Sequence, residues 1–244
     1  MFSGTGLVCA ATFEELQTFG IFGQGNAPSE VVEAGRLWRL REGYAAITGV
    51  GIPITLLRLI PWLESLKPEW VFNIGIAGAY PDNGWNIGDI ALGTSELFAD
   101  LGMELPGEKN AEKTSEEDLG KNFQPLGSTP FADPLCREPM PLQIPEGLQE
   151  SDGPLRIRLG KGATVNSCTG SAATGQSRRR IFGVDFETME GAAVALASSV
   201  RGIPLCEVRS ISNFASERDM RPENIQKALQ SLRFFWELHR RSGS

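Results

Sequence analysis

Histidine is almost absent from this chain of 244 residues, in which His239 is the only one. It lies in a basic segment, Leu238-His239-Arg240-Arg241, where we expect a solvated surface side chain. Zinc sites of the HExxH kind, Ser-His-Asp triads and Cys-His dyads all need a well-placed histidine, so the sequence excludes them. Any acid–base chemistry therefore falls to carboxylates and to water that they position.

Cysteine is also scarce. The four cysteines, Cys9, Cys136, Cys168 and Cys206, form no CxxC and no close pair. We expect reduced thiols in a cytoplasmic protein, with no metal site. The glycine-rich segments match neither GxGxxG nor GxxxxGK[ST], so ATP and dinucleotide sites are disfavoured and we expect no cofactor.

Positive charge is outnumbered, with 23 Lys and Arg against 30 Asp and Glu, for a formal net charge of −7. Nothing draws such a molecule to nucleic acid or to anionic lipid, and we expect neither as a partner. Apolar runs stay shorter than the roughly 20 residues that a membrane helix needs. The first residues lack the basic start of a secretory signal. These absences predict a cytoplasmic location.

Alternating strand and helix patterns predict a single α/β domain over residues 1–244, with three layers and a central mixed sheet. Apolar runs indicate strands at 6–11, 70–74 and 205–213, and helical spacing indicates helices at 54–66, 171–182 and 225–236. A polar stretch interrupts the pattern at 104–154 and holds eight of the fifteen prolines. We interpret it as an excursion, part loop and part lid, because it cannot bury a core of its own.

Four segments carry the residues that suit chemistry. Glu15 follows the first strand and completes a Thr-x-x-Glu capping box with Thr12, so it either only caps a helix or also holds a water. Glu190 is predicted in the first turn of a helix, where it either compensates the helix dipole or accepts hydrogen bonds from sugar hydroxyls. Asn213 ends a strand and is either a turn residue or a carboxamide that binds an amide-like ligand edge.

A glycine turn is predicted after the strand at 70–74. It consists of Gly75-Ile76-Ala77-Gly78, and glycines there let the backbone approach a ligand closely. We therefore include Gly75, Ala77 and Gly78 among the candidate binding residues.

Taken together, the chain resembles the purine nucleoside phosphorylase and nucleosidase superfamily from about Leu7 to Leu238. The segments that carry this resemblance are Ala10-Ala11-Thr12 with Glu15-Leu16, residues 73–79 (NIGIAGA), residues 189–193 (MEGAA) and residues 208–213 (VRSISN). Within the superfamily it looks most like the futalosine hydrolases, through AAT-x-x-EL, residues 98–102 (FADLG), residues 164–167 (TVNS) and the SISN ending.

The resemblance implies a role for each matching position. A glutamate at the position of Glu15 orients the attacking water, while Glu190 binds the ribose hydroxyls and Met189 packs on the sugar. Val165, Asn166 and Arg209 fall on matched segments and are predicted to bind substrate. The resemblance also implies a nucleoside substrate and a homo-oligomer. For a carboxylate on the substrate, Arg137, Lys161 and Arg209 are all available cations.

Asn213 stands where adenine-releasing relatives carry Asp. A carboxamide offers both a donor and an acceptor, which match the O6, N7 and N1–H groups of a 6-oxopurine such as hypoxanthine. The turn at 10–15 contains two acids and no arginine. The two acids repel phosphate, which favours water as the nucleophile. Two alternatives remain: an enzyme that acts on adenine thionucleosides or uses phosphate, and a catalytically silent nucleoside-binding module.

Overall fold

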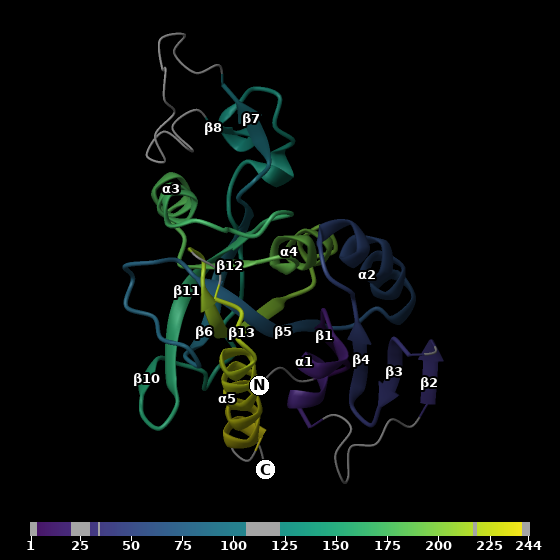
Figure 1. Ribbon diagram of the computed structural model, residues 1–244. Helices are drawn as coiled ribbons and strands as arrows, with labels where there is room; N and C mark the ends of the chain where they lie inside the picture. Colours follow the sequence, from purple (N-terminus) through teal and green to yellow (C-terminus); the bar gives the residue numbers. More distant parts are fainter. Residues whose placement is uncertain (1–3, 21–29, 34, 106–122, 217–218, 241–244) are drawn as a thin grey trace, which may run out of the picture.

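The computed structural model describes residues 4–20, 30–33, 35–105, 123–216 and 219–240. Within them an eleven-stranded mixed sheet carries helices on both faces (Figure 1). The predicted three-layer α/β fold with a central mixed sheet is confirmed. Its strands are β1 (Gly6–Ala10), β2 (Glu30–Glu33), β3 (Leu37–Leu40), β4 (Gly43–Ile47), β5 (Trp70–Ala79), β6 (Ile90–Phe98), β9 (Met140–Pro141), β10 (Ser151–Asp152), β11 (Arg156–Thr164), β12 (Phe186–Thr188) and β13 (Leu205–Phe214).

The order of the strands brings four carboxyl ends together. The sheet runs β10-β11-β6-β13-β5-β1-β4-β3-β2, with β12 paired to β11 and β5, and β9 paired to β6. The neighbours β4, β1, β5 and β13 are all parallel to one another. Because parallel strands end at the same edge, the residues that follow or end them lie close together, as in other open α/β sheets.

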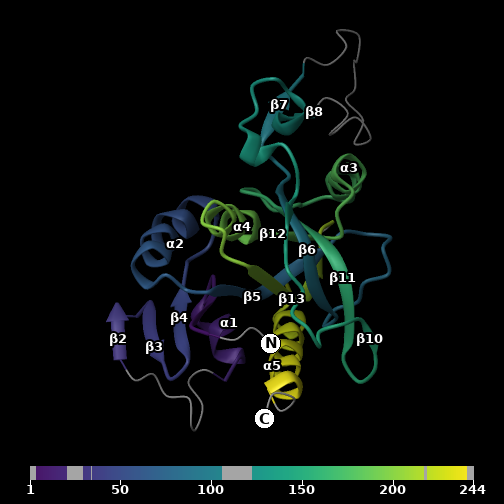
Figure 2. The same cartoon turned by 180° about the vertical axis from the view of Figure 1, so that it is seen from behind.

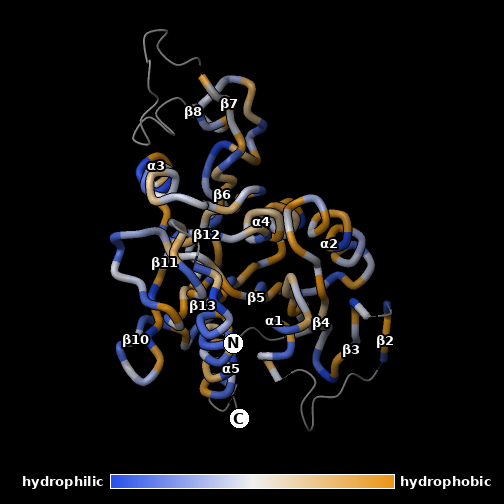
Figure 3. Tube along the Cα trace, viewed as in Figure 1, coloured by the Kyte–Doolittle hydropathy of each residue, from blue (hydrophilic) through white to orange (hydrophobic). Residues whose placement is uncertain are grey.

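Five helices lie in the described part of the chain: α1 (Phe13–Thr18), α2 (Ile52–Leu66), α3 (Ala172–Phe182), α4 (Gly191–Ser199) and α5 (Pro222–Arg240). Helices α1 and α5 pack on one face of the sheet, where Leu16, Phe19, Leu232 and Phe235 join a buried cluster. On the other face α2 and α4 supply a second cluster. Figure 2 shows the same layers from behind, and Figure 3 shows α4 as largely apolar. None of the described helices is both long and apolar enough to cross a membrane.

Helix α2 buries only part of the apolar stripe that its spacing predicts, which consists of Ile54, Leu57, Ile60 and Leu63. Leu63 is buried and Ile60 is partly buried against the core, whereas Ile54 and Leu57 are exposed, and Thr55 and Leu59 pack inward instead. Because α2 lies against α4 rather than over the middle of the sheet, the direction of its inner face depends on that neighbour.

The predicted glycine turn at 75–78 is wrong, because β5 runs straight through it to Ala79. Gly75 and Gly78 are extended, and they make room for side chains instead of reversing the chain. A Cβ on Gly75 would collide with Nη1 of Arg209 and lie 2.6 Å from Oε1 of Glu15. A Cβ on Gly78 would lie 2.9 Å from Nδ2 of Asn213. Close approach, rather than a turn, explains the glycines.

Part of the predicted excursion at 104–154, residues 106–122, lies outside the described residues. Next to it β7 (Gly102–Glu104) and β8 (Phe123–Pro125) form a separate antiparallel pair, followed by the short 3₁₀ turns η2 (Leu126–Ser128) and η3 (Pro134–Cys136). This part stands beyond α3, at the end of the molecule opposite α5 (Figures 1 and 2). Further along, β9 and β10 join the main sheet, so the segment is more ordered than a loop.

Candidate active site

A cavity of about 230 Å³ opens at the carboxyl edge of the four parallel strands. Side chains from β1–α1, β5, β12–α4 and β13 meet there, as the topology requires. The described residues that line it are Ala11, Thr12, Glu15, Val50, Ile76, Ala77, Gly78, Cys168, Glu187, Thr188, Met189, Glu190, Ser212, Asn213 and Met220. The structure thus brings together Glu15, Ala77, Gly78, Met189, Glu190 and Asn213 of the predicted site.

Glu15 both caps helix α1 and faces the cavity. Its Oε2 accepts hydrogen bonds from the backbone N–H of Thr12 at 3.0 Å and from the Thr12 hydroxyl at 2.9 Å. Its Oε1 accepts from the N–H of Ile76 at 2.9 Å. The capping box of the sequence is therefore present, and it fixes the carboxylate instead of excluding a further role. A carboxylate held by three donors retains lone-pair capacity for a water.

Glu190 directly precedes α4, as its N-cap residue, and not in the first turn as the sequence predicts. Its side chain makes no capping bond and instead accepts from the N–H of Gly51 at 3.0 Å. Burial raises the pKa of Glu190 to about 7, although the charge of Arg209 and the bond from Gly51 work against this rise. The carboxylate therefore changes its charge near neutral pH, which is common at functional sites.

Asn213 is aimed by an irregularity in β13. Ile211 pairs with Ala77 and Asn213 with Gly78, so Ser212 is the extra residue of a β-bulge. The Ser212 hydroxyl donates to Oδ1 of Asn213 at 3.0 Å, and Nδ2 of Asn213 donates to the carbonyl of Phe214 at 3.1 Å. Bulges often re-aim side chains beside active sites. One N–H of the carboxamide is left for a ligand in the cavity.

Arg209 lies below the cavity, with 1 % of its surface exposed. Its Nε and Nη2 donate to Oε1 of Glu207 at 3.0 and 2.9 Å. Burial lowers the pKa of Arg209, but the charges of Glu207, Glu190 and Glu15 outweigh burial and raise it, so the guanidinium stays charged. Its predicted contact with substrate stays a prediction, since in the described chain it is not among the lining residues.

Three other predicted binding residues also lie away from the lining formed by the described residues. Gly75 lies beneath Glu15 and Arg209, as shown by what its Cβ would meet. Val165 is fully buried, and the backbone N–H and side-chain amide of Asn166 both donate to Asp100. Their binding roles stay predictions.

The remaining candidate cations are also remote from the site. Arg137 lines a different cavity, and Lys161 is exposed and donates its backbone N–H to Asp185 at 2.9 Å.

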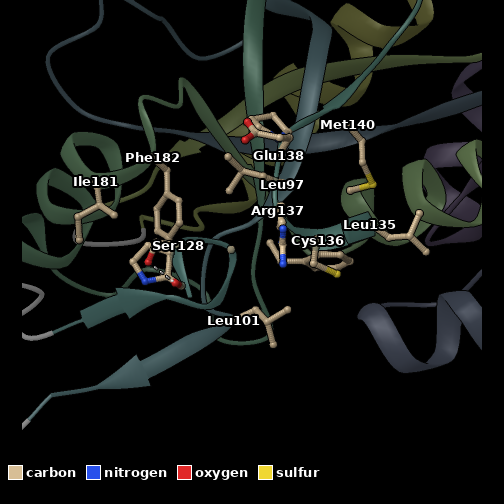
Figure 4. A pocket seen from close by; sticks show the side chains of 14 residues that line it. Leu97, Leu101, Ser128, Leu135, Cys136, Arg137, Glu138, Met140, Ile181 and Phe182 are labelled. Atoms are coloured by element: carbon tan, nitrogen blue, oxygen red, sulfur yellow. Dashed lines mark hydrogen bonds between the residues drawn. The ribbon is translucent and has the colours of Figure 1, made fainter. Parts of the chain in front are cut away.

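A second cavity, of about 330 Å³, is larger but carries different chemistry (Figure 4). It lies between β6, α3 and the turn η3, and Figure 4 shows Leu97, Phe182 and Met140 among its apolar side chains. Arg137 and Glu138 are its only charged residues within the described chain. Its described lining has a single carboxylate, whereas the smaller cavity is lined by Glu15, Glu187 and Glu190. We therefore take the smaller cavity as the candidate active site.

Sequence reasoning missed Cys168, Glu187, Thr188, Ser212 and Met220. Glu187 is buried and accepts from Tyr80, Thr169 and Arg178, with the Arg178 ion pair at 3.0 Å. Strand β12, which carries it, spans only three residues between β11 and β5. So short a strand leaves no periodic signal. In the described chain, no group of three or more His, Cys, Asp or Glu is arranged to hold a metal ion.

The comparisons agree with this fold. The family model of the Phosphorylase superfamily matches residues 23–233. The chain therefore belongs to the phosphorylase superfamily, in agreement with its three-layer fold.

Curated relatives narrow this class. The futalosine hydrolase of Acidothermus cellulolyticus is 33% identical over 192 residues, which are 76% of this chain and 70% of the relative. That of Thermus thermophilus is 29% identical over 199 residues, 80% of this chain and 81% of the relative. Within the superfamily, the chain belongs to the futalosine hydrolase family, whose members are hydrolases acting on N-glycosyl bonds.

Solved structures support the fold at lower identity. The native futalosine hydrolase of Helicobacter pylori superposes with a TM-score of 0.68 at 17% identity, covering 98% of each chain. A 5′-methylthioadenosine/S-adenosylhomocysteine nucleosidase of Helicobacter pylori superposes with a TM-score of 0.73 at 17% identity, covering 99% of this chain and 100% of the other. At this identity the two structures show the shared fold.

Proposed function

We propose that this protein hydrolyses the N-glycosidic bond of futalosine, releasing hypoxanthine and dehypoxanthine futalosine, as a step of menaquinone biosynthesis. One observation carries the proposal: the carboxylates of Glu15 and Glu190 and the carboxamide of Asn213 line one cavity. The names of the curated relatives supply the substrate.

The roles follow from the position of each group. Cleavage of the bond between C1′ and N9 passes through an oxocarbenium-like state, as in glycoside hydrolysis. Ionised Glu190 binds the ribose hydroxyls and stabilises the developing positive charge, with Met189 against the sugar. Glu15 orients a water on the face opposite the base and takes its proton.

The leaving base is held by Asn213. Its free N–H stabilises the negative charge that develops on the base by a hydrogen bond to N7 or O6. A carboxamide cannot give up a full proton, so water supplies the proton that the base finally takes. The overall reaction consumes one water, with its hydroxide joined to C1′ and its second hydrogen on the base.

The acids around the cavity favour water over phosphate. Glu15, Glu187 and Glu190 all line it, and Arg209 is already paired with Glu207. Glu187 is likewise paired with Arg178, so an incoming phosphate dianion would meet the carboxylates of Glu15 and Glu190, and the described lining contains no Lys or Arg. Hydrolysis, rather than phosphorolysis, therefore agrees with the charges.

A hypoxanthine-release assay tests the proposal. Futalosine, inosine and methylthioadenosine are each incubated with the protein, with and without phosphate, and the released base is measured. We expect release from futalosine that phosphate does not accelerate. Faster turnover with phosphate would identify a phosphorylase, and preferred release of adenine would identify a methylthioadenosine-type nucleosidase.

The variant Glu15→Gln separates an enzyme from a silent binding module. We expect turnover to fall by about 10²- to 10⁴-fold, the usual contribution of a general base, while futalosine binding is retained. Calorimetric binding of futalosine to both proteins is the control. Wild-type protein that binds futalosine and releases no hypoxanthine would favour the silent module.

We also propose a homo-oligomer in the cytoplasm. Exposed apolar side chains, including Val50, Ile54 and Leu57, lie on and just before α2, beside the Gly51 N–H that binds Glu190. Exposed apolar side chains beside a site are typical of an interface.

A further inference from the structure

Two glutamates that the proposed reaction does not use lie beneath the cavity. Glu96 on β6 and Glu207 on β13 are both completely buried, and their strands pair antiparallel. The two carboxyl groups border one space, since a Cβ added to Gly191 would collide with Oε1 of Glu96 and lie 2.7 Å from Oε1 of Glu207. Burial and the charge of Glu207 raise the pKa of Glu96 well above its usual value. Two adjacent buried carboxylates do not both ionise, so the pair holds a proton.

Glu207 is the charged member, judged by its partners. Its Oε1 accepts from Nδ2 of Asn73 at 3.0 Å and from both Nε and Nη2 of Arg209. Its Oε2 is buried, and in the described chain no N–H or hydroxyl group donates to it. A buried acceptor without a donor is costly. A protonated Glu96 would supply the missing donor and satisfy this oxygen.

The Glu207 end of the pair directs Arg209 toward Glu15. With Nε and Nη2 bound to Glu207, the rigid fork of the guanidinium fixes where Nη1 points. Nη1 and Oε1 of Glu15 both border the space above Gly75, where a Cβ would meet them. The cation therefore faces the carboxylate that is proposed to hold the water.

The Glu96 end holds the start of α4. The hydroxyls of Thr164 and Thr188 donate to the Glu96 carboxyl group at 2.8 and 3.3 Å. The same hydroxyls accept from the N–H of Ala192 at 2.6 Å and of Gly191 at 3.1 Å. These are the first two amides of α4, directly after Glu190, so Glu96 anchors the backbone that carries Glu190.

We propose that Glu96 and Glu207 form a proton-sharing pair that positions both catalytic carboxylates, with Glu207 holding Arg209 against Glu15 and Glu96 holding the start of α4 at Glu190. In the described chain neither glutamate lines the cavity, so both are positioning residues. This inference rests on the proposed futalosine hydrolysis and adds to it the groups that fix the geometry.

Steady-state kinetics of three variants test the positioning role. Glu207→Gln leaves Arg209 without its charged partner, and Glu96→Ala removes both the proposed donor to Glu207 and the acceptor of the Thr164 and Thr188 hydroxyls. In both we expect kcat to fall by roughly 10- to 100-fold, the size expected when a reacting group is slightly misplaced, with KM changed by less than about threefold. Glu96→Gln keeps a neutral donor of the same shape and is expected to restore kcat to within about threefold of wild type. Glu237→Gln on exposed α5 is the matched control.

Infrared spectroscopy tests the proton without using activity. At pH 8.5, above the pKa of about 7 for Glu190, the wild type should retain the carbonyl band of a protonated, buried carboxylic acid. The band should disappear in Glu96→Gln and persist in Glu237→Gln. If the wild type released no hypoxanthine from futalosine, the proposed function would fail while this test of the pair would still stand.

Three results would overturn the inference: wild-type kcat in Glu207→Gln, equal impairment of Glu96→Gln and Glu96→Ala, or no acid band that depends on Glu96. Thermal melting checks that each variant folds. If Glu207→Gln does not fold, the comparison of the two Glu96 variants decides, and wild-type kcat in Glu96→Ala then counts against the positioning role.

Discussion

Asn213 is the residue on which the choice of base depends. Its carboxamide oxygen accepts a hydrogen bond from Ser212, and one of its two N–H groups donates to the carbonyl of Phe214. The second N–H group is left to donate to a ligand in the cavity. An aspartate at this position would place a negative charge against the O6 and N7 acceptors of a 6-oxopurine. The bulge at Ser212 would still aim it into the cavity.

The variant Asn213→Asp should therefore change the preferred base. We expect kcat/KM for futalosine to fall by about 10- to 100-fold, because a hydrogen bond to the base is lost and charge repulsion is gained. We expect kcat/KM for methylthioadenosine to rise. Base release from both nucleosides measures it, with Asn224→Asp on α5 as the control. An unchanged ratio between the kcat/KM values of the two substrates would show that Asn213 does not select the base.

Glu190 links activity to pH. With its pKa raised to about 7, Glu190 loses its charge as the pH falls through neutrality, and the proposed mechanism needs the ionised form. Its effect on stability has the opposite sense. A folded-state pKa above the unfolded one stabilises the fold at low pH, and this stability is lost as the pH rises through the folded pKa.

The variant Glu190→Gln should consequently be inactive yet more stable than wild type at high pH. We expect a gain of about 2–3 kcal/mol in unfolding free energy at pH 8.5, because the neutral amide avoids burying a charge, and little change at pH 4. Urea unfolding at both pH values measures it. Equal gains at the two pH values would point to packing instead of charge.

At the scale of elements, the sequence predicts those whose pattern is local. The capping box at Thr12 and Glu15 is confirmed, as is the apolar stripe of α5 through Ala228, Leu232 and Phe235. Such signals depend only on residues a few positions apart, so they survive in any tertiary context.

The elements that the sequence does not give depend on distant partners. From sequence alone, Gly75 is predicted in a turn, but in the structure it leaves room for the side chains of Arg209 and Glu15. Leu57 is predicted in the core, but helix α4 packs against the other face of α2. The bulge at Ser212 depends on the register between β13 and β5. Glu96 and Glu207 meet only once β6 and β13 pair, so nothing in their own segments predicts the pair.

The path of β5 through its glycines makes a direct prediction. In Gly75→Ala the added methyl group collides with Arg209 and Glu15, both of which are fixed by other bonds. We expect a loss of about 1–3 kcal/mol in stability and a lower kcat, because overpacking displaces both groups. The matched control is Gly170→Ala, where a Cβ meets nothing within 4 Å. A Gly75→Ala protein with wild-type melting temperature and kcat would contradict this account.

At the scale of the whole molecule, one edge of the sheet collects the reacting groups while the apolar surface of α2 lies beside it. Leu57 is 71% exposed, and Val50, which is 53% exposed, also lines the active-site cavity. Val50 therefore belongs both to the exposed apolar side chains and to the cavity lining. A second copy of the chain docked on α2 would cover this surface and shield the cavity from solvent, which strengthens the charge interactions inside it.

Leu57→Glu tests this arrangement, because a charge at a highly exposed position changes the stability of a single chain by only about 0.5 kcal/mol. If α2 forms the interface, light scattering should show a smaller particle for Leu57→Glu than for wild type. Its hypoxanthine release per chain should fall and should recover at high protein concentration. Phe131→Glu, at another strongly exposed apolar position outside the described cavity lining, is the control. Equal particle mass and equal activity for wild type and Leu57→Glu would place any interface elsewhere.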